Sequence, residues 1–220
     1  MDYAGNKIMP VAASAVNGSA NLDELLNHNL TVLPSLVQLL TRAGADAGDL
    51  DPEQVKEILS DKVRAAAAAV GNNETTLRLK DVEGIAAGGM GVVFQGTESE
   101  LRRRVALKVG LDPVGTEAAT RFEREVAQTW ELAAGNASIP NIIRAGVLPE
   151  GRLPYYTMEL VEGSTLESLI HEFYKMVDVN SVNWRNESSA RGLLTHLGHA
   201  AEALDYAHRQ GVIHRDVKPN

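Results

Sequence analysis

The stretch Ile85-Ala86-Ala87-Gly88-Gly89-Met90-Gly91-Val92-Val93-Phe94 places a group of glycines between two apolar runs. Apolar runs on both sides predict two paired strands, and the glycines predict a tight turn between them. Because glycine lacks a side chain, such a turn can approach a ligand closely or adopt positive φ, and its amide groups can face a phosphate chain. Most glycine hairpins are only turns, so this stretch by itself leaves a phosphate-binding role open.

The strand expected next contains Val105-Ala106-Leu107-Lys108-Val109. Side chains alternate along a strand, so the valines and Leu107 share one face while Ala106 and Lys108 share the other. If the first face meets the core, the second lies beneath the glycine turn. There a small alanine leaves room for a flat ring, and an ammonium group can contact phosphate oxygens. The alternative is a strand with one solvent-facing lysine.

A helix is expected over residues 116–134, with a threonine cap at its start and a glycine just past its end. Among its carboxylates are Glu123 and Glu125. Glu125 flanks the predicted buried stripe, which ends at Trp130, and can project towards the sheet. It is therefore the candidate partner of Lys108, although an isolated ion pair of this kind carries little weight without the other motifs.

The remaining patterns complete the expected order of elements. Strands are expected over residues 76–85, 92–95, 104–109, 142–147 and 155–160, and later helices over 165–176 and 190–209. Five strands with one helix after the third, followed by helices, is an α+β order.

The N-terminal part has a different texture. Residues 1–20 lack periodicity and are predicted to be disordered. Helices are expected between residues 21 and 71, with a break at Pro34 and a new start at Asp51-Pro52. Two interpretations of these helices remain open: a cap that packs on the strands, or a dimerisation or recruitment element.

Composition limits the function classes. The chain has 220 residues, is 44% hydrophobic and carries a net charge of −8, which fits a globular protein without general affinity for nucleic acid. It has no cysteine, which excludes disulfides and thiolate chemistry. No apolar stretch reaches the roughly 18 residues of a membrane span. No signal peptide is recognisable, so a cytoplasmic location is expected.

The end of the chain, His214-Arg215-Asp216-Val217-Lys218-Pro219-Asn220, makes the pattern specific. From about residue 76 onward the chain resembles a bacterial-type (eukaryotic-like) serine/threonine protein kinase. The glycine turn resembles the family's G-x-G-x-x-G-x-V loop, VALK its third-strand lysine motif, and HRDVK its catalytic loop. RFERE resembles the helix-C segment, Ile139-Pro140-Asn141-Ile142 the link after it, and residues 156–163 the hinge.

The resemblance implies a five-stranded antiparallel N-lobe with one helix (76–160), an incomplete helical C-lobe (161–220) and a helical extension before them (21–75). ATP and Mg²⁺ would be the cofactors, and a protein serine or threonine hydroxyl the acceptor. Lys108 would contact the α- and β-phosphates, and Glu125 would hold it. Asp216 would orient the proton of the attacking hydroxyl, and Lys218 would steady the transferring phosphoryl group.

The same resemblance implies a set of residues around the nucleotide. They are Ile85, Ala86, Gly88, Gly89, Gly91, Val93, Ala106, Lys108, Met158, Glu159 and Val161. Met158 would be the gatekeeper, and backbone groups of Glu159 and Val161 would face adenine.

The chain also departs from the family pattern. Ala86 replaces the first loop glycine, and Ile139 replaces the usual histidine. The magnesium-binding asparagine is expected one place beyond Asn220, so Asn220 is not assigned as a ligand. The D-F-G aspartate is expected later still, and no metal ligand is therefore expected among these residues. We expect this chain alone to bind ATP, to have negligible kinase activity and to be marginally stable.

Two other functions compete with the kinase. A pseudokinase-like module that binds nucleotide for regulation would keep the same lobe. Lys108, Glu125 and Asp216 are all retained, however, so the sequence shows no sign of a decayed site. A metabolite kinase of related fold fits the combined motifs less well. The sequence indicates neither the protein substrate nor the oligomeric state.

Overall fold

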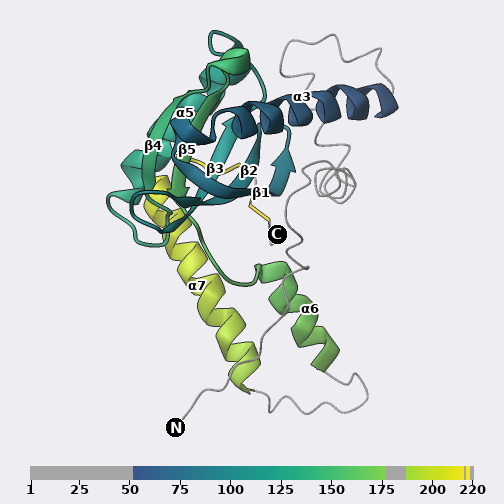
Figure 1. Ribbon diagram of the computed structural model, residues 1–220. Coiled ribbons are helices and arrows are strands. Elements are labelled where there is room, and N and C mark those ends of the chain that lie inside the picture. The colour runs from purple at the N-terminus through teal and green to yellow at the C-terminus, as the bar shows by residue number, and fades with distance from the viewer. Residues whose placement is uncertain (1–51, 177–186, 216, 219–220) are drawn as a thin grey trace.

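The computed structural model describes residues 52–176, 187–215 and 217–218. Its centre is a five-stranded antiparallel sheet with the order β1-β2-β3-β5-β4 (Figure 1). The strands are β1 (Leu79–Gly88), β2 (Gly91–Glu98), β3 (Arg104–Gly110), β4 (Ile142–Val147) and β5 (Pro154–Glu159). The helices are α3 (Pro52–Asn72), α4 (Glu74–Leu77), α5 (Glu117–Ala133), α6 (Leu166–Met176) and α7 (Glu187–Arg209), with a short 3₁₀ turn, η2 (Glu150–Arg152). The α+β class and the five predicted strands are confirmed. Residues 1–51, including the predicted disordered stretch, lie outside the described part.

The first strand begins later than predicted. Residues 74–77 form the short helix α4, which ends at Arg78 in the left-handed conformation with φ of 57°. This turn places Leu77 in the core with 2% of its surface exposed. Propensity alone does not reveal such a one-turn helix, because burial of one leucine decides it.

Helix α3 covers one face of the sheet, which we call the outer face. Val63, Ala66 and Val70 of α3 share one buried cluster with Phe94 of β2 and Leu107 of β3. Val63, Ala66 and Leu107 are fully buried. The alanines of α3 allow close contact because they add little bulk between helix and sheet. Of the two interpretations of the N-terminal helices, the packing of α3 fits the cap; the predicted helices before residue 52 lie outside the described part.

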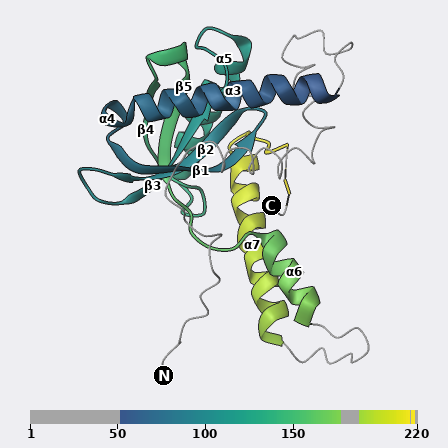
Figure 2. The same ribbon diagram turned by 45° about the vertical axis from the view of Figure 1, so that its right-hand side comes forward.

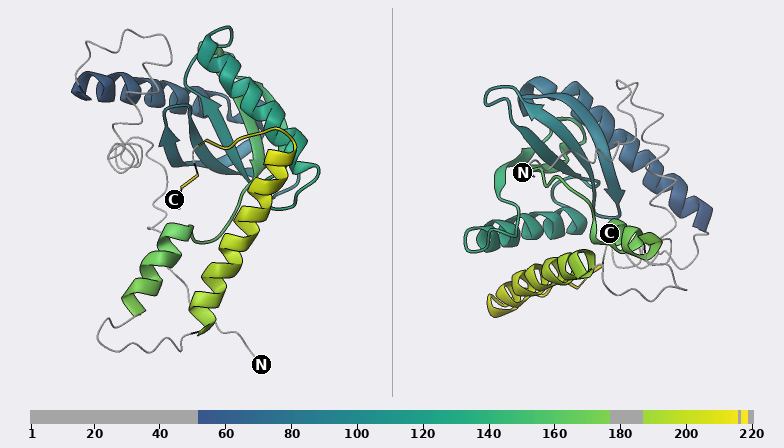
Figure 3. Two further views of the ribbon diagram at one scale, coloured as in Figure 1. Left: turned by 180° about the vertical axis from the view of Figure 1, so that it is seen from behind. Right: turned by 90° about the horizontal axis from the view of Figure 1, so that it is seen from below.

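Helix α5 lies against the opposite, inner face of the sheet, as the views in Figure 3 show. Phe122 of α5 packs with Ile142 of β4 and Tyr156 of β5 in a second buried cluster. Trp130 is 60% exposed, so its predicted place in the buried stripe is wrong. Near the end of the helix, Leu132 and Ala133 are buried instead.

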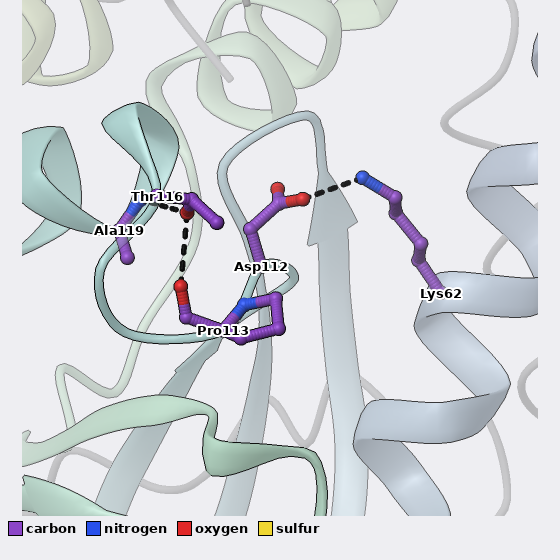
Figure 4. A network of polar contacts seen from close by, with 5 residues as sticks. All are labelled: Lys62, Asp112, Pro113, Thr116 and Ala119. Atoms are coloured by element: carbon purple, nitrogen blue, oxygen red, sulfur yellow. Dashed lines mark hydrogen bonds and ion pairs between the residues drawn. The ribbon is translucent and has the colours of Figure 1, made fainter.

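An ion pair joins α3 to the segment that leads into α5 (Figure 4). Lys62 Nζ donates to Asp112 Oδ1 at 2.7 Å. A few residues on, Thr116 caps α5: its hydroxyl accepts from Ala119 N at 3.2 Å and donates to Pro113 O at 2.9 Å. The predicted threonine cap is confirmed, and the start of α5 is thereby fixed relative to the outer-face helix.

Helices α6 and α7 lie side by side below the sheet (Figure 2). Tyr206 of α7 packs directly on Gly135, just past α5, where a Cβ atom would lie 1.9 Å from the tyrosine hydroxyl. Leu194 and Leu197 of α7 are exposed. Within the residues described, no helix combines the length and apolar character needed to cross a membrane.

The packing of α3 predicts different costs for two adjacent truncations. Leu59→Ala removes a side chain that is 6% exposed, whereas Ile58→Ala removes one that is 39% exposed. We expect Leu59→Ala to lower the free energy of unfolding by about 2–5 kcal/mol. For Ile58→Ala we expect a loss of about 1 kcal/mol or less. Urea denaturation measures both, and equal losses would show that α3 does not pack on the sheet.

Candidate active site

Two rows of side chains cross the inner face of the sheet. Residues directly opposite each other in an antiparallel pair point to the same face. The first row runs through Ala86, Val93, Lys108 and Tyr156, on β1, β2, β3 and β5. The second row runs through Gln95, Ala106, Met158 and Ile142, on β2, β3, β5 and β4. Four of the residues predicted to surround a nucleotide (Ala86, Val93, Ala106 and Met158) therefore share one face with Lys108.

Lys108 and Glu125 form the polar centre of this face. Lys108 Nζ donates to Glu125 Oε1 at 2.5 Å, and the side chains are 16% and 28% exposed. The pairing predicted from the sequence is confirmed. The alternating pattern of β3 is confirmed too, because Val105, Leu107 and Val109 belong to the outer-face core. A pair that is mostly buried is screened less by salt than a surface pair.

Tyr156 is a member of this centre that the sequence analysis missed. Its hydroxyl donates to Glu125 Oε1 at 2.9 Å, and its side chain is buried. Its ring lies 5.4 Å from that of Phe122, and Lys108 Nζ lies 6.0 Å from its centre. Burial, and then the charge and hydrogen bond of Glu125, raise the pKa of Tyr156 well above its ordinary value of 10.0. The only available signal was its place on β5, two residues before Met158 and on the same face.

The second carboxylate oxygen of Glu125 differs from the first in its hydrogen bonding. Oε2 is buried and has no hydrogen-bond partner among the described residues. A buried acceptor without a partner costs about 1–3 kcal/mol, and more when it is charged. The carboxylate is thus held through one oxygen only, by two donors that come from two different strands.

The glycine turn is a two-residue hairpin in which Gly89 and Met90 connect Gly88 to its partner Gly91. The turn does not use the positive φ that glycine allows: among the described glycines, those with positive φ are at positions 115, 151, 163 and 211. Close approach explains Gly91 instead. A Cβ there would lie 2.6 Å from Val109 O and 3.4 Å from Lys108 Cε. At Gly88, by contrast, a Cβ would meet nothing within 4 Å.

Ile85 occupies an irregular position of β1. The register shifts between Gly84 and Ala86, so Ile85 has no direct partner on β2 and is 38% exposed. Such a bulge re-aims a side chain relative to the regular strand. Ile85 thus lies outside the two rows, on the edge strand β1.

The predicted hinge, residues 156–163, begins within β5 and continues past its end at Glu159, and side chains anchor it. The Glu159 carboxylate accepts from Asn141 N and Asn141 Nδ2, each at 3.2 Å, and Glu159 N donates to Asn141 O at 3.1 Å. Glu162 accepts from Arg104 Nη1 at 2.6 Å. Val161 is 75% exposed. The side chain of Glu159 therefore connects the end of β5 to the segment just before β4.

The predicted catalytic loop is described only in part. Asp216 and Asn220 lie outside the described residues, so the position of Asp216 relative to Lys108 stays a prediction. Lys218 is exposed, and Arg215 adopts a left-handed φ of 63°. Non-glycine residues rarely adopt this conformation, and it often marks a functional turn.

The two glycines give a matched pair of substitutions. Gly91→Ala forces a Cβ against the Val109 carbonyl, and we expect it to lower the free energy of unfolding by about 1–3 kcal/mol. Gly88→Ala places its Cβ in open space, and we expect a change within about 0.5 kcal/mol. Thermal and urea unfolding measure both. If Gly88→Ala destabilised the protein as much as Gly91→Ala, the described packing of this hairpin would be wrong.

Comparisons with known proteins agree with this architecture. A family model described as protein kinase domain matches residues 79–220. A probable serine/threonine-protein kinase of Clostridium acetobutylicum is 34% identical over 145 residues, which cover 65% of this chain and 20% of that protein. Serine/threonine-protein kinase PknA of Mycobacterium tuberculosis is 36% identical over 141 residues, which cover 61% of this chain and 29% of that protein.

Serine/threonine-protein kinase PknK of the same organism is 32% identical over 171 residues, or 78% of this chain and 14% of that protein. The chain thus spans between 14% and 29% of the lengths of these relatives. The family match covers well over half of the chain and coincides with the sheet, α5 and the helices that follow. The chain therefore belongs to the protein kinase domain family, among relatives of the bacterial serine/threonine type.

Proposed function

We propose that this chain forms the ATP-binding part of a serine/threonine protein kinase, which transfers the γ-phosphoryl group of ATP to a protein hydroxyl. The observation that carries the proposal is the Lys108–Glu125 pair on the inner face of the sheet. The pair lies beside the glycine hairpin. A Cβ atom at Gly91 would be only 3.4 Å from Lys108 Cε. A fixed cation next to a backbone turn suits a phosphate chain.

The described residues fit a nucleotide at this place. Open space at Gly88 leaves the backbone of the hairpin accessible to phosphate oxygens. Ala106, one row away from Lys108, is small enough to lie against the flat base. Glu159 and Val161 come just after Met158 in the sequence, and we assign their main-chain polar groups to the adenine edge.

The residues of the chain contribute charge and position, which is what phosphoryl transfer demands most. In the proposed role, Lys108 contacts the α- and β-phosphates and Glu125 keeps its ammonium group at that point. Asp216 would accept the hydroxyl proton and Lys218 would neutralise charge on the moving phosphoryl group. Mg²⁺, when bound, would supply positive charge that neutralises the phosphates. Within the residues described, no three histidine, cysteine, aspartate or glutamate side chains gather as a metal site, so no role in magnesium binding is assigned to them.

Substitution of Lys108 tests the proposal. We expect Lys108→Met to weaken ATP binding by about 10- to 100-fold, because a charged contact contributes about 1.5–3 kcal/mol. Lys80→Met is the matched control, since Lys80 is an exposed lysine of the same sheet. Isothermal titration with ATP in magnesium buffer measures both. Equal affinities of the wild type and Lys108→Met would overturn the assigned site.

A transfer assay separates the two candidate functions. Lysine-dependent phosphorylation of a protein substrate by a protein that carries this chain supports the kinase. Tight, lysine-dependent binding of ATP without transfer in that protein would favour the regulatory nucleotide-binding module.

A further inference from the structure

Strand β5 carries two adjacent tyrosines that point to opposite faces of the sheet. Tyr155 belongs to the outer-face cluster beneath α3. Tyr156 belongs to the inner-face cluster with Phe122. The two rings are similarly buried, with 7% and 3% of their surface exposed. Of the two, Tyr156 is the one whose hydroxyl donates to a charged group, Glu125 Oε1.

We propose that Tyr156 is a positioning residue of the nucleotide site, whose hydroxyl holds Glu125 Oε1 so that the carboxylate stays in reach of Lys108. This inference rests on the ATP-binding function proposed above. It adds to the lysine–glutamate pair a third group, which comes from a different strand and contacts no phosphate itself.

The geometry explains why a third group is needed. Lys108 reaches Glu125 through a long, flexible side chain, and phosphate oxygens would compete with the carboxylate for the same ammonium group. Tyr156 has only two side-chain torsions, and its ring is fixed against Phe122 at 5.4 Å. Its hydroxyl therefore contacts the carboxylate at little entropic cost. Since Oε2 has no partner among the described residues, Oε1 is the oxygen through which the carboxylate is held.

The protonation state of Tyr156 suits this role. Its pKa is raised, so the folded protein keeps the hydroxyl proton at pH values where an exposed tyrosine ionises. A raised pKa in the folded state gives a stabilisation that is complete below pH 10 and is lost as the pH rises further, because the unfolded chain then releases the proton. At neutral pH the hydroxyl therefore keeps its proton and donates it in the hydrogen bond to Glu125 Oε1.

The test is Tyr156→Phe, with Tyr155→Phe as its matched control on the other face of the same strand. Both changes remove one hydroxyl and keep the ring, so the fold is preserved. We expect Tyr156→Phe to weaken binding of ATP, measured by isothermal titration in magnesium buffer, by about 3- to 30-fold. Tyr155→Phe should change it by less than about twofold. Equal effects of the two variants would overturn the inference.

A double-mutant comparison separates positioning from packing. In a Glu125→Ala background the hydroxyl has no carboxylate to hold, so Tyr156→Phe should cause no further loss of ATP affinity. If Tyr156→Phe caused the same loss with and without Glu125, its role would be packing only and the inference would be wrong.

A spectroscopic titration gives a readout that does not depend on nucleotide. The ultraviolet absorbance of the folded protein rises as tyrosines ionise near pH 10. Because the pKa of Tyr156 is raised above that range, Tyr156→Phe should leave this rise unchanged. Loss of part of the rise in Tyr156→Phe would show an ordinary, unpaired hydroxyl and would contradict the inference.

The results also distinguish the two proposals from each other. If Lys108→Met abolishes ATP binding and Tyr156→Phe binds as the wild type does, the nucleotide site stands and the role of Tyr156 falls. If the wild type binds no ATP, the proposed function falls, and the positioning role in that site falls with it.

Discussion

One carboxylate oxygen connects helix α5 with strands β3 and β5. Glu125 Oε1, on helix α5, receives hydrogen bonds from Lys108 on β3 and from Tyr156 on β5. The helix and the two central strands are thereby fixed at a common point on the inner face. If that oxygen moved, the ammonium group would lose its anchor, and the row of side chains around it would lose its centre.

The outer face of the sheet supports the same point from behind. Leu107 precedes Lys108 on β3 and is buried against the α3 side, so the lysine is held by a strand that cannot tilt freely. The pair between Lys62 and Asp112 then links α3 to the segment before α5. Lys108 thus lies on a strand whose other face packs in the α3 cluster, and the segment that leads to the helix of Glu125 is paired with α3. The family match begins at residue 79, so α3 lies before the part of the chain that the protein kinase domain model matches.

Much of this arrangement is predictable from sequence, because it depends on short periodic patterns. The alternation in Val105–Val109 and the position of Glu125 beside an apolar stripe predict the ion pair, and the pair is present. The features that sequence failed to predict depend on contacts between distant segments. Tyr156 acquires its partner only when β5 lies beside β3, and the need for glycine at position 91 arises from the Val109 carbonyl on another strand. Trp130 looked buried because its spacing is helical, but the fold buries Leu132 and Ala133 in this part of α5 and leaves Trp130 60% exposed.

The central claim is that Lys108, held by Glu125, contacts the phosphates of a nucleotide on the inner face of the sheet. A crystal structure of the protein with ATP bound tests this most directly. The account predicts Lys108 Nζ within hydrogen-bond distance of both a phosphate oxygen and Glu125 Oε1, with the base against Ala106 and the phosphates beneath the backbone of Gly88. A nucleotide bound elsewhere, or phosphates that lie away from Lys108, would contradict it.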